Sequence, residues 1–216
     1  MAKVSAISAR MNFENAADLL RAQGLSVESA RLTQSYLRAE VAASNSQTVY
    51  NFPLLVNKPD PTNFNTQQKL NLQDAFVCAE FGVFLAFPSA ATDTNFPLLT
   101  WPSPVAAGAA YPSTETLYNG KLTVTLNNNV IVPAWDVLRC KYVPFTQTAG
   151  GESSITDSVD FSNDGFYPVE PNLIISGAGN YNVQLVLPQS FGTVVANQRI
   201  VLIGRGILAQ NVTSVQ

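Results

Sequence analysis

The sequence predicts a mainly β protein, built as one antiparallel sandwich of two sheets behind an N-terminal helical arm. From about residue 47 onward, short apolar runs alternate with Pro, Gly and Asn, which is typical of a chain of short strands. Helical spacing of apolar residues occurs only before that point. The length of 216 residues fits one sandwich. We therefore divide the chain into an arm, residues 1–46, and a sandwich domain, residues 47–216.

The first part of the arm predicts a helix that starts after Asn12, a residue type that caps helix N-termini well. Gly24 stands where a helix commonly ends in a left-handed glycine. One face of this helix collects four apolar residues: Phe13, Ala16, Ala17 and Leu20.

A second helix is predicted over residues 26–41, with Ser26 as its cap. Its evidence is a row of residues at spacings of 3, 4, 3 and 4: Val27, Ala30, Gln34, Leu37 and Val41. Such a stripe needs a surface to pack on, either the main domain or a neighbouring subunit. Packing on its own domain is the commoner outcome.

Ten strands are predicted after the arm, and the clearest is Lys121–Leu126, where apolar and polar residues alternate. A turn follows at Asn127, Asn128 and Asn129, because Asn tolerates left-handed backbone angles. Residues 200–203 are apolar throughout, which predicts a strand covered on both faces. The predicted strands are 48–56, 70–77, 80–87, 96–101, 117–126, 129–132, 135–145, 172–176, 180–188 and 199–209.

Two glycine pairs punctuate the late strands. Gly177-Ala178-Gly179 is predicted to be a hairpin turn. Gly204-Arg205-Gly206 is predicted to be a bulge or a close approach of two backbones. Neither pair opens a helix, so neither predicts a phosphate-binding loop.

The composition argues against most enzyme chemistry. The chain has no histidine, which removes the Ser-His-Asp triad, the Cys-His pair and histidine metal sites. Cys78 and Cys140 lie in apolar segments and are expected to be buried, reduced thiols, with a disulfide as the open alternative. We expect no enzyme activity and no cofactor, and an enzyme using paired carboxylates is the last of our hypotheses.

One acidic loop is a weak candidate for calcium. Asp157, Asp160 and Asp164 lie close together in sequence, and Ca²⁺ takes several oxygen ligands. Their spacing does not match the EF-hand loop, so a solvated acidic loop is the favoured interpretation.

The charge and hydropathy of the sequence limit the classes of partner that this protein is expected to have. Charged residues make up 12% of the chain, against roughly 25% in an average soluble domain. A surface with few charges is desolvated at little cost, which favours a protein packed against other protein. The net charge of −3 and the lack of Lys and Arg clusters argue against nucleic-acid binding. We find no apolar stretch of about 20 residues and no signal peptide, so we expect synthesis in a cytoplasm.

Three segments carry a resemblance to a known class of protein: residues 70–86, 117–145 and 166–188. They resemble jelly-roll virion proteins, and in particular capsid proteins of tailless icosahedral phages. The resemblance implies a jelly-roll subunit without catalytic residues or a small-molecule substrate, which assembles with itself or other virion proteins into a shell. The arm is not basic, which departs from shells whose arms bind the packaged genome.

Two nearly identical segments suggest where subunits meet. NFPLLV spans residues 51–56 and NFPLLT spans residues 95–100, and the proline in each confines a strand to a sheet edge or to its first residues. The candidate contact residues are Leu54, Leu55, Leu98 and Leu99, with Val27 and Leu37 from the arm.

The alternative function is a carbohydrate- or receptor-binding sandwich, such as a fibre tip or a decoration protein. Aromatic side chains on a sheet face stack on sugars. Trp101 borders a loop and is the freer candidate, whereas Trp135 lies in an apolar strand and is expected in the core.

Overall fold

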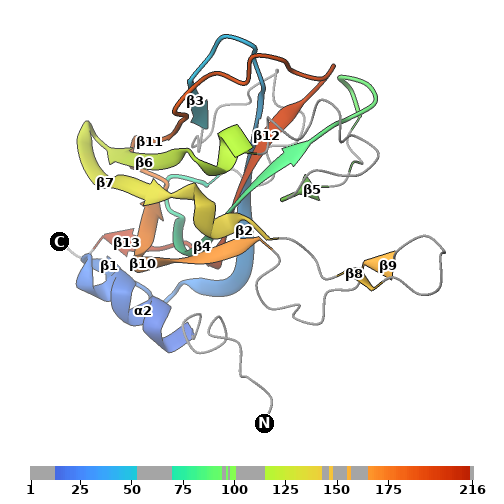
Figure 1. The fold of residues 1–216 in the computed structure, drawn as a ribbon. Helices are drawn as coiled ribbons and strands as arrows, with labels where there is room; N and C mark the ends of the chain where they lie inside the picture. Colours follow the sequence, from blue (N-terminus) through green and yellow to red (C-terminus); the bar gives the residue numbers. More distant parts are fainter. Residues whose placement is uncertain are drawn as a thin grey trace.

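A computed structural model describes residues 13–52, 70–93, 96, 98–100, 115–142, 146–147, 155–156 and 165–214. In this part of the chain two antiparallel sheets pack face to face, and the short helix α2 (Phe13–Ala22) lies against one of them (Figure 1). The predicted sandwich with a helix near its N-terminus is confirmed.

The two sheets differ in size. The larger has the order β10–β4–β12–β2, with the short β5 also paired to β4, and the smaller has the order β3–β11–β6–β7. Two further strand pairs are short. The larger sheet contains β2 (Arg31–Ala42), β4 (Ala75–Ala86), β5 (Leu98–Leu99), β10 (Phe166–Ser176) and β12 (Arg199–Gln210). The smaller contains β3 (Val49–Phe52), β6 (Lys121–Leu126), β7 (Asn129–Asp136) and β11 (Tyr181–Val186). Outside them lie β1 (Leu25–Ser26) with β13 (Thr213–Ser214), β8 (Thr146–Gln147) with β9 (Ile155–Thr156), and the 3-10 helix η2 (Val137–Cys140).

The strand pairing is nested. If β5 and the two short pairs are set aside, eight strands remain, and the first pairs with the last (β2 with β12). The second pairs with the seventh (β3 with β11), the third with the sixth (β4 with β10), and the fourth with the fifth (β6 with β7). A long hairpin rolled into two sheets produces this pattern, which is the jelly roll.

The centre of the larger sheet is covered on both faces. All twelve residues of β4 are buried, and β12 is buried at all but three positions. One face meets the smaller sheet in the main core, and the other meets α2 at one end and Phe96 and Leu98 at the other. Residues 200–203 therefore have no solvated face, as their unbroken apolar sequence predicts.

Helix α2 is amphipathic, and three small or branched residues on one face are buried. Ala16, Ala17 and Leu20 pack on Val77 of β4 and Ile207 of β12. Gly24 follows the helix with φ of +73°, the left-handed conformation that favours glycine. The prediction of a helix here is confirmed, although Phe13 is 43% exposed and does not share the buried face.

The prediction of a second helix over residues 26–41 is wrong. Residues 31–42 form β2, which pairs with β12 through all twelve of its residues. Leu37 and Ala39 face the main core, and the opposite face of β2 carries Arg38 and Glu40. Thus β2 is part of the sandwich, although it lies within the segment assigned to the arm.

The turns follow the local chemistry of Asn and Gly. Asn127 and Asn128 have φ of 48° and 68° and close the β6–β7 hairpin. The ladder between β12 and β4 shifts at Arg205 and Gly206, and a Cβ atom on Gly206 would overlap the backbone of Val77. The Gly204-Arg205-Gly206 prediction is therefore confirmed in both its forms, bulge and close approach.

The predicted hairpin at Gly177-Ala178-Gly179 is wrong. The turn is present, but β10 before it and β11 after it belong to different sheets. Gly177 is required for another reason, because a Cβ atom there would overlap the backbone of Asn71. The strands predicted over 70–77 and 80–87 are likewise one strand, β4.

Candidate functional site

Three features of the described surface combine polar side chains from distant parts of the sequence: an ionic cluster, a cleft beside it, and a pocket lined by amides. The ionic cluster joins β2 to β12. Glu40 is only 3% exposed, and its carboxylate lies 2.6 Å from Arg38 and 2.9 Å from Arg199. Both guanidinium groups also lie over the ring of Phe96, at 5.6 and 5.4 Å from its centroid.

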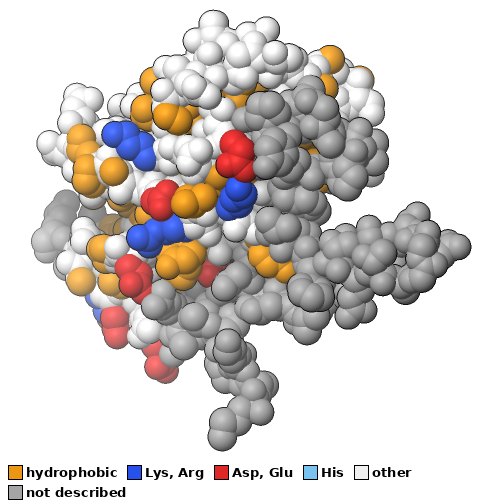
Figure 2. Space-filling view, viewed as in Figure 1, with side chains coloured by type: hydrophobic (Ala, Val, Ile, Leu, Met, Phe, Trp, Pro, Cys, Tyr) orange, Lys and Arg blue, Asp and Glu red, His pale blue; other side chains and the backbone are white. Residues whose placement is uncertain are grey.

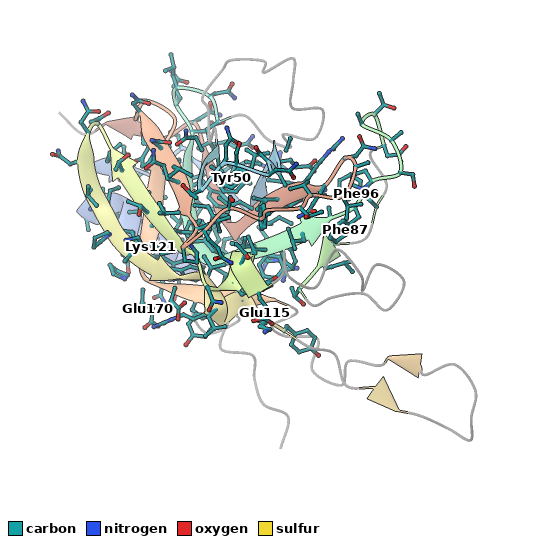
Figure 3. All side chains as sticks on the ribbon, turned by 45° about the horizontal axis from the view of Figure 1, so that its top comes forward. Tyr50, Phe87, Phe96, Glu115, Lys121 and Glu170 are labelled. Atoms are coloured by element: carbon teal, nitrogen blue, oxygen red, sulfur yellow. The ribbon has the colours of Figure 1, made fainter. Side chains whose placement is uncertain are left out.

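This cluster holds backbone segments together. Arg199 also donates a hydrogen bond to the carbonyl of Ala91, so the cluster ties the segment after β4 to the sheet. Figure 3 shows Phe96 near Phe87, at the end of the sandwich away from Glu170. A carboxylate already shared by two guanidinium groups is a poor general base, so the geometry supports a structural clamp.

A cleft of about 530 Å³ lies next to the clamp on the outer face of the larger sheet. Glu80 of β4 is 1% exposed and lies opposite Arg205 of β12 in the ladder. The Arg205 guanidinium carbon lies 3.4 Å from the centroid of the Phe166 ring. The described residues that line the cleft include no second carboxylate that could form an acid–base pair with Glu80.

The third feature, which we call the amide pocket, has a volume of about 500 Å³ and lies on the smaller sheet. Its described lining comes from β3, β6 and β11 and the turns beside them, and it contains no Asp, Glu, Lys or Arg: Asn51, Phe52, Thr125, Asn128, Asn180, Tyr181 and Asn182. These side chains can donate and accept hydrogen bonds but carry no charge.

The buried titratable groups are unsuited to nucleophilic chemistry. Cys78 and Cys140 are free and buried. Burial raises the pKa of the Cys140 thiol to about 12, and that of Cys78 is raised for the same reason. Burial also raises the pKa of Tyr118 well above its usual value, and its hydroxyl donates to the carbonyl of Val83 at 2.8 Å. These groups stay protonated near neutral pH and act as packing residues.

The predicted contact residues fall in three kinds of place. Val27 is 8% exposed and packs with α2, and Leu37 is 5% exposed in the main core, so both stabilise their own subunit. Leu98 and Leu99 are half-buried in β5, which borders the larger sheet beside β4, as the proline argument predicts. Leu54 and Leu55 lie outside the described residues.

The candidate calcium loop, Asp157, Asp160 and Asp164, also lies outside the described residues, as does Trp101. Within the described ranges, no group of three or more acidic or cysteine side chains is placed to hold a metal ion. Trp135 is 8% exposed and packs edge-on against Phe81 with centroids 5.8 Å apart, so its predicted core position is confirmed.

Charges are unevenly distributed over the visible surface. Figure 2 shows acidic and basic side chains gathered in the middle and lower part of one face, whereas its top, on the side of β3, is uncharged and partly apolar. One pair of opposite charges there is in contact, since Lys141 lies 2.7 Å from Glu115, and Lys121 is the ladder neighbour of Asp136. The charged part of this face is therefore suited to solvent and the uncharged part to burial.

Comparison with known proteins finds no family model that matches the sequence and no curated protein with significant similarity to it. Among the described residues, no helix is both long enough and apolar enough to cross a membrane.

Sequence reasoning missed the clamp and the amide pocket. Glu40 and Arg199 are 159 residues apart, and Glu40 fell within the predicted helix. The chain has 19 asparagines, but only the fold shows that four of them share one pocket.

Proposed function

We propose that this chain is a structural virion protein, a self-assembling capsid subunit of an icosahedral phage shell. The observation that carries the proposal is the complete nested pairing of the jelly roll, from β2 with β12 to β6 with β7. Lectins and cupins use the same architecture, so the fold alone does not decide between a shell and a binding protein. Composition and surface supply the remaining support.

Covering the surface of this protein with another protein costs little desolvation free energy. Only 12% of the residues are charged, and neutral polar residues face outward along β6 and β11 at Thr123, Thr125, Asn182 and Gln184. Neutral polar side chains lose less free energy on desolvation than ions do. A capsid subunit buries several faces at once, and this composition suits that requirement.

Apolar side chains are also exposed at the edge of the smaller sheet. Val130 and Ile131 are 58% and 43% exposed on β7, the edge strand beyond β6. An edge strand with bulky apolar residues is a place where a second chain can add. We assign this edge as one contact between subunits, together with β5.

The proposal is tested by light scattering of the purified full-length chain across a range of protein concentrations. We expect particles many times heavier than the 23.2 kDa subunit, formed without added nucleic acid. A chain that stays monomeric at the highest concentration contradicts the proposal and favours the binding-module alternative.

A further inference from the structure

We propose that the amide pocket binds a neutral saccharide. The site goes beyond the shell function and stands on its own geometry. Its volume of about 500 Å³ falls within the roughly 300–1,000 Å³ of small-molecule sites. Trp135, one of the aromatic residues considered for sugar stacking, is not among the described residues that line the pocket.

The rim of the pocket is held in place by two hydrogen bonds between turns. The backbone N–H of Asn127 donates to the backbone carbonyl of Asn180 at 2.9 Å. The backbone N–H of Asn180 donates to the side-chain Oδ1 of Asn127 at 3.1 Å. These bonds fasten the β6–β7 turn to the segment that enters β11. The backbone that carries Asn128 and Asn180 is therefore positioned before any ligand arrives, which lowers the entropy cost of binding.

The strands that carry the pocket are also fixed. Phe52 is fully buried and Tyr181 is 6% exposed, and the Tyr181 hydroxyl donates to the carbonyl of Ile174 at 2.9 Å. Oδ1 of Asn51 accepts from Nε2 of Gln184 at 2.8 Å, which sets the orientation of the Asn51 amide. Phe52 and Tyr181 belong to the main core on the other face of the sheet, so the pocket lies on strands that the core holds in place, and the Asn51 amide has a defined orientation.

The lining selects the class of ligand. A charged ligand would lose hydration without meeting an opposite charge in the described lining. An apolar ligand would remove water from several amides and would offer no hydrogen bonds in place of those that the water made. A polyhydroxylated neutral ligand offers both donors and acceptors at close spacing, which matches amides and the Thr125 hydroxyl.

A peptide also carries neutral donors and acceptors, but the location disfavours it. Extended peptides bind by adding to a strand edge, where a row of backbone groups is open. The described lining of the amide pocket comes from the edge strand β3 and from β11 and β6, which are internal strands of the smaller sheet, so most of it lies away from the open edge. Its polar groups are side chains that converge at the end of the sheet, which suits a compact sugar.

Saturation-transfer NMR on the full-length chain tests the site, because it tolerates large assemblies. The neutral probes are lactose, maltotriose and N,N′-diacetylchitobiose, and the comparison probes are 3′-sialyllactose and N-acetyl-triglycine amide. We expect transfer to at least one neutral sugar and weaker transfer to the sialylated one. Transfer to none of the neutral sugars, or to the peptide alone, overturns the proposal.

Two variants locate the binding. Asn128→Gly removes an amide at a residue with φ of 68°, which glycine tolerates, and Asn182→Thr removes another on β11. Each should weaken sugar binding by about tenfold, the effect of losing one or two neutral hydrogen bonds. The matched control is Asn211→Gly, at φ of 60° and outside the pocket, which should bind like the parent. Equal affinity of all three variants contradicts the site, whether or not the chain assembles.

Discussion

Glu40 on β2 lies 2.9 Å from Arg199 on β12, which joins the first and last of the eight jelly-roll strands across 159 residues of sequence. Arg38 shares the same carboxylate, so the pair is part of the clamp described above. In a chain with 12% charged residues, the clamp concentrates three of them where two non-local strands and the segment after β4 meet.

Removing the carboxylate should destabilise the fold strongly. Glu40→Gln leaves two mostly buried guanidinium groups facing each other, and we expect a loss of about 3 kcal/mol in the free energy of unfolding. Urea denaturation measures it. The matched control is Asp18→Asn, which removes a partner of Arg21 from an exposed pair. If the two variants are equally stable, the clamp contributes nothing of note.

Truncation should show that the folded state depends more strongly on β2 than on α2. Deletion of residues 1–24 removes α2 and uncovers Val77 and Ile207, so we expect a less stable but folded sandwich. Deletion of residues 1–41 also removes nearly all of β2 and leaves β12 unpaired on one side, so we expect no folded domain. Circular dichroism and thermal melting compare the two. A folded product from the longer deletion would show that β2 is dispensable.

The glycine bulge should tolerate no side chain. Gly206→Ala places a Cβ atom against the backbone of Val77, which can move only if β4 and β12 separate. We expect a loss of about 3 kcal/mol or more, at the upper end for overpacked sites. Gly24→Asn is the control, because Gly24 has open space around it and Asn tolerates its φ of +73°. Chemical denaturation of both variants decides the matter, and equal stability would contradict the close approach.

Alkaline pH should destabilise the protein through its buried thiols. Burial raises the pKa of Cys140 from 9.0 to about 12 in the folded chain, so the unfolded chain loses this proton first. The free energy of unfolding should therefore be unaffected by this thiol below about pH 9 and should fall as the pH rises from 9 towards 12.

The measurement is urea denaturation at several pH values, with Cys140→Ala as the control. The variant should lose less stability than the parent over that alkaline range. An identical pH dependence in the two proteins would show that the Cys140 proton plays no part.

Assembly should depend on the exposed edge of the smaller sheet. The double variant Val130→Thr and Ile131→Thr keeps β-branched side chains but removes apolar surface, so the fold should persist and assembly should weaken. Leu72→Ser is the control, since Leu72 is 66% exposed and lies in a turn before β4. Sedimentation velocity should show smaller species for the double variant alone. Unchanged assembly would exclude this edge as a contact.

Local signals predicted the parts of the fold that depend on local chemistry. Alternation in Lys121–Leu126 predicted β6, the asparagines after it predicted the hairpin turn, and Gly24 marked the end of α2. The edge position of Leu98 and Leu99 followed from Pro97, because proline cannot donate to the ladder.

The same local reasoning wrongly predicted a helix where β2 lies, because β2 is determined by contacts that are distant in sequence. Its inward residues Leu37 and Ala39 alternate correctly, but Leu32 on the other face also packs, against the α2 cluster. Apolar residues on both faces obscure the period of two and leave a chance spacing of 3 and 4. The partner that decides the matter, β12, lies about 160 residues away, and the amides of the pocket meet only after both sheets close.

Electron microscopy of the purified full-length chain tests the central claim most directly. The account predicts closed particles of uniform diameter, or rings that are fragments of them, made of this chain alone or with another virion protein. A field of single 23.2 kDa domains at every concentration, with or without lysate of an infected host, would contradict a shell subunit.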